Sequence, residues 1–76
     1  MRIYLGGHLN FYHPQKSAWL EVNFDEAKRL ADILEAEGIP LGEVHLVVIN
    51  GETQDLQTIL PPDQDEVKLY SAVGGG

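Results

Sequence analysis

The chain opens with short stretches in which apolar and polar residues alternate. Ile3 and Leu5 alternate with Arg2 and a tyrosine, which is the two-residue period of a strand with one buried face. A segment containing glycine, asparagine and proline interrupts this pattern, and alternation returns over residues 18–24. The pattern predicts two strands that are joined by a loose connection.

The period then changes to that of a helix. Apolar residues recur at spacings of three and four, as on one face of an amphipathic helix, and they are Ala27, Leu30, Ala31 and Leu34. Asn23 or Asp25 could cap the first turn, and Gly38 followed by Pro40 marks the end. We therefore expect a helix over residues 26–37.

The second half of the chain returns to strand patterns. Residues 44–49 are rich in β-branched side chains and end in the Asn-Gly dipeptide at 50–51, which favours a tight type I′ turn. A short strand is predicted near residues 53–56. After the Pro-Pro-Asp break at 61–63, alternation over residues 67–70 predicts a last strand.

The order strand, strand, helix, strand, strand, strand predicts an α+β fold. One helix would cover one face of a mixed sheet of four to five strands, which is the β-grasp, or ubiquitin-like, arrangement. We expect one such domain over residues 1–73, followed by a flexible glycine tail over residues 74–76. A chain of 76 residues has no room for a second independent core, which needs about 50 residues of its own.

Charge and composition narrow the classes of partner. Twelve acidic against five basic side chains give a formal net charge of −7, which opposes binding to nucleic acid or to an anionic membrane. The same charge favours a protein partner with a basic surface. The longest apolar run, residues 46–49, is far shorter than a membrane span. With no cysteine and no signal-peptide pattern, we expect a cytoplasmic protein without disulfides.

The histidines do not predict a metal or catalytic site. His8, His13 and His45 lack the helical spacing or the cysteine neighbours of common metal sites. Ser17 is close to two of them only along the chain, which does not support a catalytic triad. We expect no bound metal or cofactor and no catalytic machinery belonging to the chain itself.

Three aromatic residues fall on the strand phase opposite to the core. Tyr4, Trp19 and Tyr70 would point to the sheet face that the helix does not cover, and there they would be cross-strand neighbours. Two interpretations remain open. The rings stabilise the sheet, or they form a docking patch, since tyrosine and tryptophan are enriched at interface hot spots.

Several segments together resemble a known family. They are YLGGHLNFY at 4–12, DILEAEGIP at 32–40, VINGE at 48–52, DQDEV at 63–67 and the final glycines. In this order they are similar to the β-grasp sulfur carriers, typified by the small subunit of molybdopterin synthase and the thiamin sulfur carrier. The segments are spread over nearly the whole chain.

This resemblance implies a carrier without intrinsic catalysis. A ubiquitin-activating-like adenylyltransferase would use ATP to adenylate the carboxylate of Gly76, with Gly75 beside it and Gly74 lengthening the arm. Sulfur transfer would then give a thiocarboxylate that donates sulfur in cofactor biosynthesis, with a molybdopterin-type pathway favoured. A large synthase subunit is a further possible partner. Glycines suit a tail that threads into another protein, because their backbone can approach closely and takes unusual dihedrals.

Alternatives to the sulfur carrier remain open from the sequence. A glycine terminus also occurs as a simple disordered end or as a remnant of cloning. A ubiquitin-like modifier would use the same tail to form an isopeptide bond, and a non-catalytic adaptor would use only the sheet face. The fold alone does not separate these functions.

Overall fold

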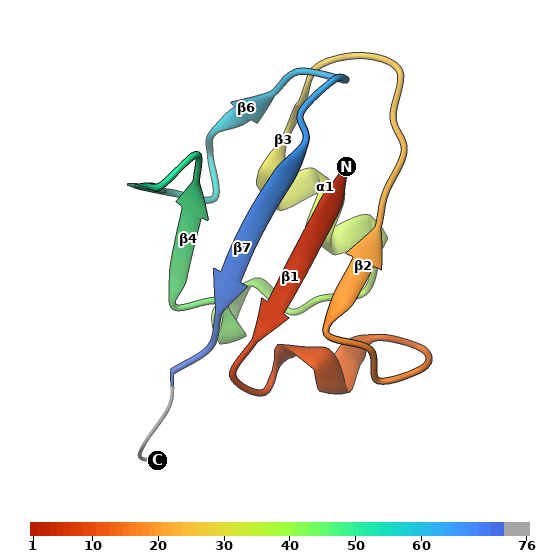
Figure 1. Cartoon of the computed structure of the whole chain (residues 1–76), viewed down its shortest axis with the longest axis vertical. Coiled ribbons are helices and arrows are strands. Elements are labelled where there is room, and N and C mark those ends of the chain that lie inside the picture. The colour runs from red at the N-terminus through yellow and green to blue at the C-terminus, as the bar shows by residue number, and fades with distance from the viewer. Residues whose placement is uncertain (73–76) are drawn as a thin grey trace.

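The alternating segments of the chain form one mixed sheet in the computed structural model (Figure 1). At its centre β1 (Arg2–Gly6) pairs in parallel with β7 (Glu66–Tyr70). β2 (Trp19–Glu21) pairs antiparallel with β1, and β4 (Leu46–Ile49) pairs antiparallel with β7. β5 (Glu52–Gln54) completes the order β2-β1-β7-β4-β5. The predicted α+β, β-grasp arrangement is confirmed.

The structure describes residues 1–72. The predicted glycine tail over residues 74–76 therefore lies outside the described residues. Among the residues described, no helix is long and apolar enough to cross a membrane.

One face of the sheet and the helix enclose the core. In β1, β2 and β7 the strand residues that face inward are the ones that the alternation predicted, and helix residues pack against them. The most deeply buried side chains are Ile3, Leu5, Leu9, Leu30, Leu34, Leu60, Val67 and Leu69. Burial of this apolar face fixes which face of each strand remains open.

The helix is shorter than predicted. α1 spans Leu30–Ala36, whereas the four-residue segment before it lies outside the helix, and Lys28–Arg29 forms the short strand β3. β3 pairs with β6 (Ile59–Leu60), a strand that the sequence pattern did not predict. The correction therefore moves the start of the helix from residue 26 to residue 30.

Backbone carbonyl groups explain where α1 begins. The N–H groups of Leu30 and Ala31 donate to the carbonyl oxygens of Thr58 and Leu56, each at 2.9 Å. These bonds satisfy first-turn donors that have no partner within a helix, so the predicted caps at Asn23 or Asp25 are not used. They also hold the segment before β6 against the start of α1.

Charge at the first turn of α1 agrees with the helix dipole. Arg29 donates to both carboxylate oxygens of Asp32, at 3.3 and 2.8 Å. This hydrogen bonding holds the pKa of Asp32 below its usual value and raises that of Arg29. An acidic side chain is favourable near a helix N-terminus. At the other end Gly38 has φ +78° and ends the helix as predicted.

The predicted hairpin turn is confirmed. Asn50 and Gly51 have φ of 54° and 79°, the two positive values that a type I′ turn requires. The turn joins β4 to β5, which lies slightly earlier than predicted. β2 is likewise shorter than the predicted span over residues 18–24.

Two short 3₁₀ helices lie in the connections. η1 (Leu9–Tyr12) follows β1, and η2 (Leu41–Glu43) precedes β4. Leu9 of η1 is fully buried, so the connection between β1 and β2 contributes to the core instead of forming the loose link that the sequence suggested.

Replacement of Leu34 by alanine tests the core assignment of α1. Leu34 is fully buried, and we expect Leu34→Ala to lower the free energy of unfolding by about 2 to 5 kcal/mol through lost burial and a cavity. Urea denaturation followed by circular dichroism measures this loss. Glu35→Ala, at an exposed position of the same helix, is the control. Equal stabilities of the two variants would contradict the assignment.

Candidate functional site

Three aromatic side chains come together on the sheet face opposite α1. Tyr4 and Trp19 are direct cross-strand partners, and their ring centroids lie 5.1 Å apart at an interplanar angle of 60°. The rings of Tyr4 and Tyr70 lie 5.8 Å apart at 59°. The predicted clustering of the three rings on the uncovered face is therefore confirmed.

Leu46 extends this apolar surface. It pairs in register with Tyr70 and is 38% exposed, and Trp19 is 40% exposed. We call Tyr4, Trp19, Leu46 and Tyr70 the open-face patch. The sequence analysis missed Leu46, because a run of consecutive apolar residues does not reveal which of them face the core.

A glycine makes the ring packing possible. Gly6 is opposite Tyr70 in the parallel pair, and a Cβ added to it would lie 2.6 Å from Cδ1 of Tyr70 and 3.0 Å from Cε2 of Tyr4. It would also lie 2.9 Å from the carbonyl oxygen of Leu69. In the sequence this glycine belongs to the segment that interrupts the strand alternation, so its packing role was not predicted. Aromatic side chains that cover a glycine on a neighbouring strand are the signal that could have identified it.

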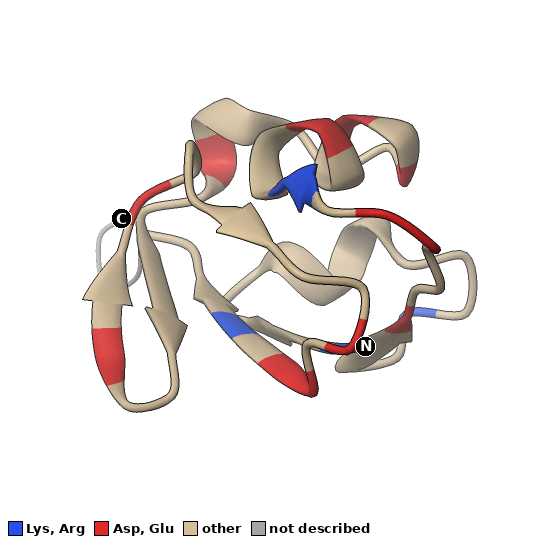
Figure 2. Cartoon of the chain, turned by 90° about the horizontal axis from the view of Figure 1, so that it is seen from above, with Lys and Arg blue, Asp and Glu red and all other residues tan. Residues whose placement is uncertain are grey.

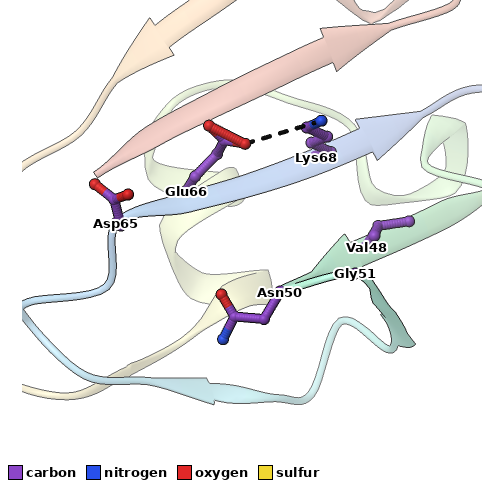
Figure 3. A pocket seen from close by; sticks show the side chains of 6 residues that line it. All are labelled: Val48, Asn50, Gly51, Asp65, Glu66 and Lys68. Atoms are coloured by element: carbon purple, nitrogen blue, oxygen red, sulfur yellow. Dashed lines mark ion pairs between the residues drawn. The ribbon is translucent and has the colours of Figure 1, made fainter.

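Charged residues occupy the other end of the open face. Arg2 pairs with Glu66 at 2.7 Å, and Nζ of Lys68 lies 4.0 Å from the same carboxylate. A pocket at this end is lined by Val48, Asn50, Gly51, Asp65, Glu66 and Lys68 (Figure 3). The carboxylate of Glu66 in this pocket is paired with the cations of Arg2 and Lys68. We therefore interpret the pocket as a solvated, charged margin of the sheet. In residues 1–72 no three histidine or carboxylate side chains form a group that could hold a metal ion.

The end of β7 is held between two connections. The hydroxyl of Ser71 is buried, with 5% of the residue exposed, and accepts a hydrogen bond from the N–H of His8 at 2.8 Å. The N–H of His45 donates to the carbonyl of Tyr70, also at 2.8 Å. These bonds fix the point from which the chain continues towards residues 73–76, directly beside the open-face patch.

The predicted site residues thus divide into two groups. Tyr4, Trp19 and Tyr70 lie together on the open face. Gly74, Gly75 and Gly76 lie outside the described residues. The hydrogen bonds that the backbone N–H groups of His8 and His45 donate at the end of β7 were not predicted, because bonds between distant segments leave no periodic pattern in the sequence.

Replacement of Gly6 by alanine tests the close packing of the rings. The added methyl would collide with Tyr70 and with a backbone carbonyl, so we expect Gly6→Ala to displace that ring and destabilise the domain by about 1 to 3 kcal/mol. Near-ultraviolet circular dichroism reports the rings, and urea denaturation reports the stability. Gly42→Ala is the control, since an added Cβ there meets nothing within 4 Å. An unchanged aromatic signal in Gly6→Ala would contradict the packing.

Comparison with known proteins agrees with this fold. No curated protein matches the chain. A family model described as Mut7-C ubiquitin matches residues 1–73, nearly the whole sequence. That family is a small ubiquitin-like domain, which is consistent with the β-grasp fold of the sulfur carriers. By this match over the whole folded region, the chain belongs to the Mut7-C ubiquitin family.

Proposed function

We propose that this ubiquitin-like domain is a sulfur carrier that works as a protein cosubstrate. The observation that carries the proposal is the sequence Gly74-Gly75-Gly76, which follows β7, the central strand of the sheet, after three intervening residues. The end of that strand is fixed by Ser71 and lies beside the open-face patch. A partner would therefore bind the open-face patch while the glycines enter its active site.

The proposed chemistry takes place at the carboxylate of Gly76. A carboxylate oxygen attacks the α-phosphorus of ATP in the activating enzyme, and pyrophosphate leaves. A sulfide-level nucleophile then attacks the acyl carbon, AMP leaves, and a thiocarboxylate remains. Activation as an acyl adenylate divides one difficult substitution into two easier ones. The carrier supplies the carboxylate and the docking surface, and the enzyme supplies ATP and the catalytic groups.

The partner in this proposal is a ubiquitin-activating-like adenylyltransferase. A net charge of −7 favours attraction to an enzyme with a basic surface, and the open-face patch supplies apolar contact area. The sulfur acceptor would be a cofactor precursor, for which we favour the molybdopterin type on the resemblance of the sequence. In that case a large synthase subunit would be a second partner for the same face.

A second candidate function is favoured by the open-face patch itself. A modifier or adaptor would use this patch to bind other proteins, and an adaptor would not need the tail at all. Intact-mass analysis of the protein from its native host separates the candidates. Replacement of one oxygen by sulfur supports the carrier, and covalent adducts with other proteins support the modifier. An unmodified mass, with binding that does not depend on the tail, supports the adaptor.

Removal of Gly76 tests the role of the tail. We expect the variant without Gly76 to lose ATP-dependent pyrophosphate release in the presence of the activating enzyme, because the reacting carboxylate is misplaced. Its melting temperature should remain close to that of the wild type, since terminal residues generally contribute little to stability. Adenylation of the shortened chain at the wild-type rate would contradict the tail hypothesis.

Replacement of Trp19 tests the role of the open-face patch. We expect Trp19→Ala to weaken binding to the activating enzyme by about 1 kcal/mol or more, the usual threshold for a contributing interface residue. Trp19→Phe keeps a ring beside Tyr4 and should lose less. Binding kinetics measured at two ionic strengths should show slower association at high salt for every variant, because salt screens long-range charge. Equal affinities for wild type and Trp19→Ala would leave the rings with a purely structural role.

A further inference from the structure

Phe11 is the most exposed large apolar side chain among residues 1–72. It lies in η1 and is 64% exposed. Its position is nevertheless fixed: its N–H donates to the carbonyl of His8 at 3.0 Å, and its ring packs edge-on against Tyr12 with centroids 5.7 Å apart. Tyr12 in turn is partly buried against the core. An ordered, exposed aromatic ring loses little conformational entropy when a partner covers it.

Lys16 also contacts the ring of Phe11. Its ammonium group lies 4.4 Å from the centroid of the Phe11 ring and donates to the carbonyl of Phe11 at 2.9 Å. Lys16 has φ +58°, a conformation that residues other than glycine seldom adopt. The N–H of Lys16 donates to the carbonyl oxygen of His13 at 2.9 Å, and the carbonyl oxygen of Lys16 accepts from the side-chain amide of Asn10 at 3.2 Å. The surrounding loop therefore maintains this conformation. A disfavoured backbone that is held in place in this way is often associated with function.

The charge of this loop is opposite to that of the whole protein. Residues 6–18 contain no aspartate or glutamate, although the chain has twelve, and Lys16 is their one lysine or arginine. Within the part of the chain that is described, Lys16 takes part in no ion pair, and the same holds for Lys28, whereas Arg2, Arg29 and Lys68 each do. Figure 2 shows acidic positions on α1, on the β4–β5 hairpin and on the segments that lead into α1 and β7. The loop is therefore a neutral to cationic area on an acidic molecule.

The loop lies at the end of the sheet where β7 finishes. β1 and β7 are parallel, and Gly6, which leads into the loop, is in register with Tyr70 (Figure 1). The hydrogen bond from His8 to Ser71 ties the loop directly to the last described residues. Any protein that receives the glycine tail must approach this end of the domain.

We propose that this loop is a second docking element for the protein that receives the tail. The contact surface is the hollow lined by His8, Asn10, Phe11 and Lys16. The partner would present an apolar surface that carries carboxylates, because the ring needs apolar cover and the ammonium group of Lys16 needs an opposite charge. This inference rests on the proposed function. It adds an acidic contact surface on the partner, next to the basic surface of the partner that the net negative charge of the carrier attracts.

Adenylation kinetics test the proposal on the full chain. The probe is the activating adenylyltransferase purified from the native host, and pyrophosphate release is measured against carrier concentration. We expect Phe11→Ala and Lys16→Glu each to raise the KM for the carrier roughly fivefold or more, with kcat unchanged because the reacting carboxylate is elsewhere. Lys16→Gln, which keeps a hydrogen-bond donor without the charge, should have an intermediate effect.

Matched controls come from the β3–β6 sheet. Ile59 is 61% exposed, nearly as much as Phe11, and Lys28 is an exposed lysine on the neighbouring strand. Ile59→Ala and Lys28→Glu should leave the KM near the wild-type value. Thermal melting checks that all variants are folded, and Lys16→Gln carries the test if Phe11→Ala is destabilised.

The possible outcomes separate this inference from the proposed function. A wild-type KM for both Phe11→Ala and Lys16→Glu, with normal adenylation, overturns the loop proposal and leaves the carrier proposal standing. An equal increase of the KM in the control variants Ile59→Ala and Lys28→Glu also overturns the loop proposal, since the effect would then not be local to the loop. If the wild-type chain is not adenylated at all, the carrier proposal fails and the loop proposal fails with it.

Discussion

The parallel pairing of β1 with β7 is the constraint on which the other features depend. It joins segments more than sixty residues apart in the sequence, from Arg2 opposite Glu66 to Gly6 opposite Tyr70. Closing so long a loop costs entropy, which the buried faces of the two strands repay through the core beneath them. The same pairing brings the end of β1 and the end of β7 to one edge of the domain. The aromatic rings, the η1 loop and the last described residues after β7 are neighbours for this single reason.

Local periodicity predicted those parts of the fold in which one strand or helix face is buried. The alternation in β1 and β7 and the Asn-Gly turn identified the central sheet and its hairpin correctly. The start of the helix was wrong because Lys28 and Arg29 fit a helical pattern as well as a strand. Their conformation depends on β6, about thirty residues later, whose two residues are too few to show a period. Pairing between such short, distant segments is decided by tertiary contacts.

The candidate site was predictable to a similar extent. Strand phase placed Tyr4, Trp19 and Tyr70 on one face, since side chains two residues apart share a face. Phe11 and Lys16 were not singled out, because they lie in an irregular connection where no period applies. Their association requires a left-handed residue and several side-chain contacts to the backbone, which only the three-dimensional structure reveals.

The two outer strands of the sheet bear on the solubility of a protein with an exposed aromatic face. An unpaired strand edge is a template for pairing with another chain, and aggregation often begins there. Here β2 and β5 are each three residues long, and each carries a glutamate, Glu21 or Glu52. Short acidic edges on a molecule with net charge −7 repel second copies of the same chain. The domain can therefore keep its rings accessible to partners, while its strand edges disfavour pairing with the edges of other copies.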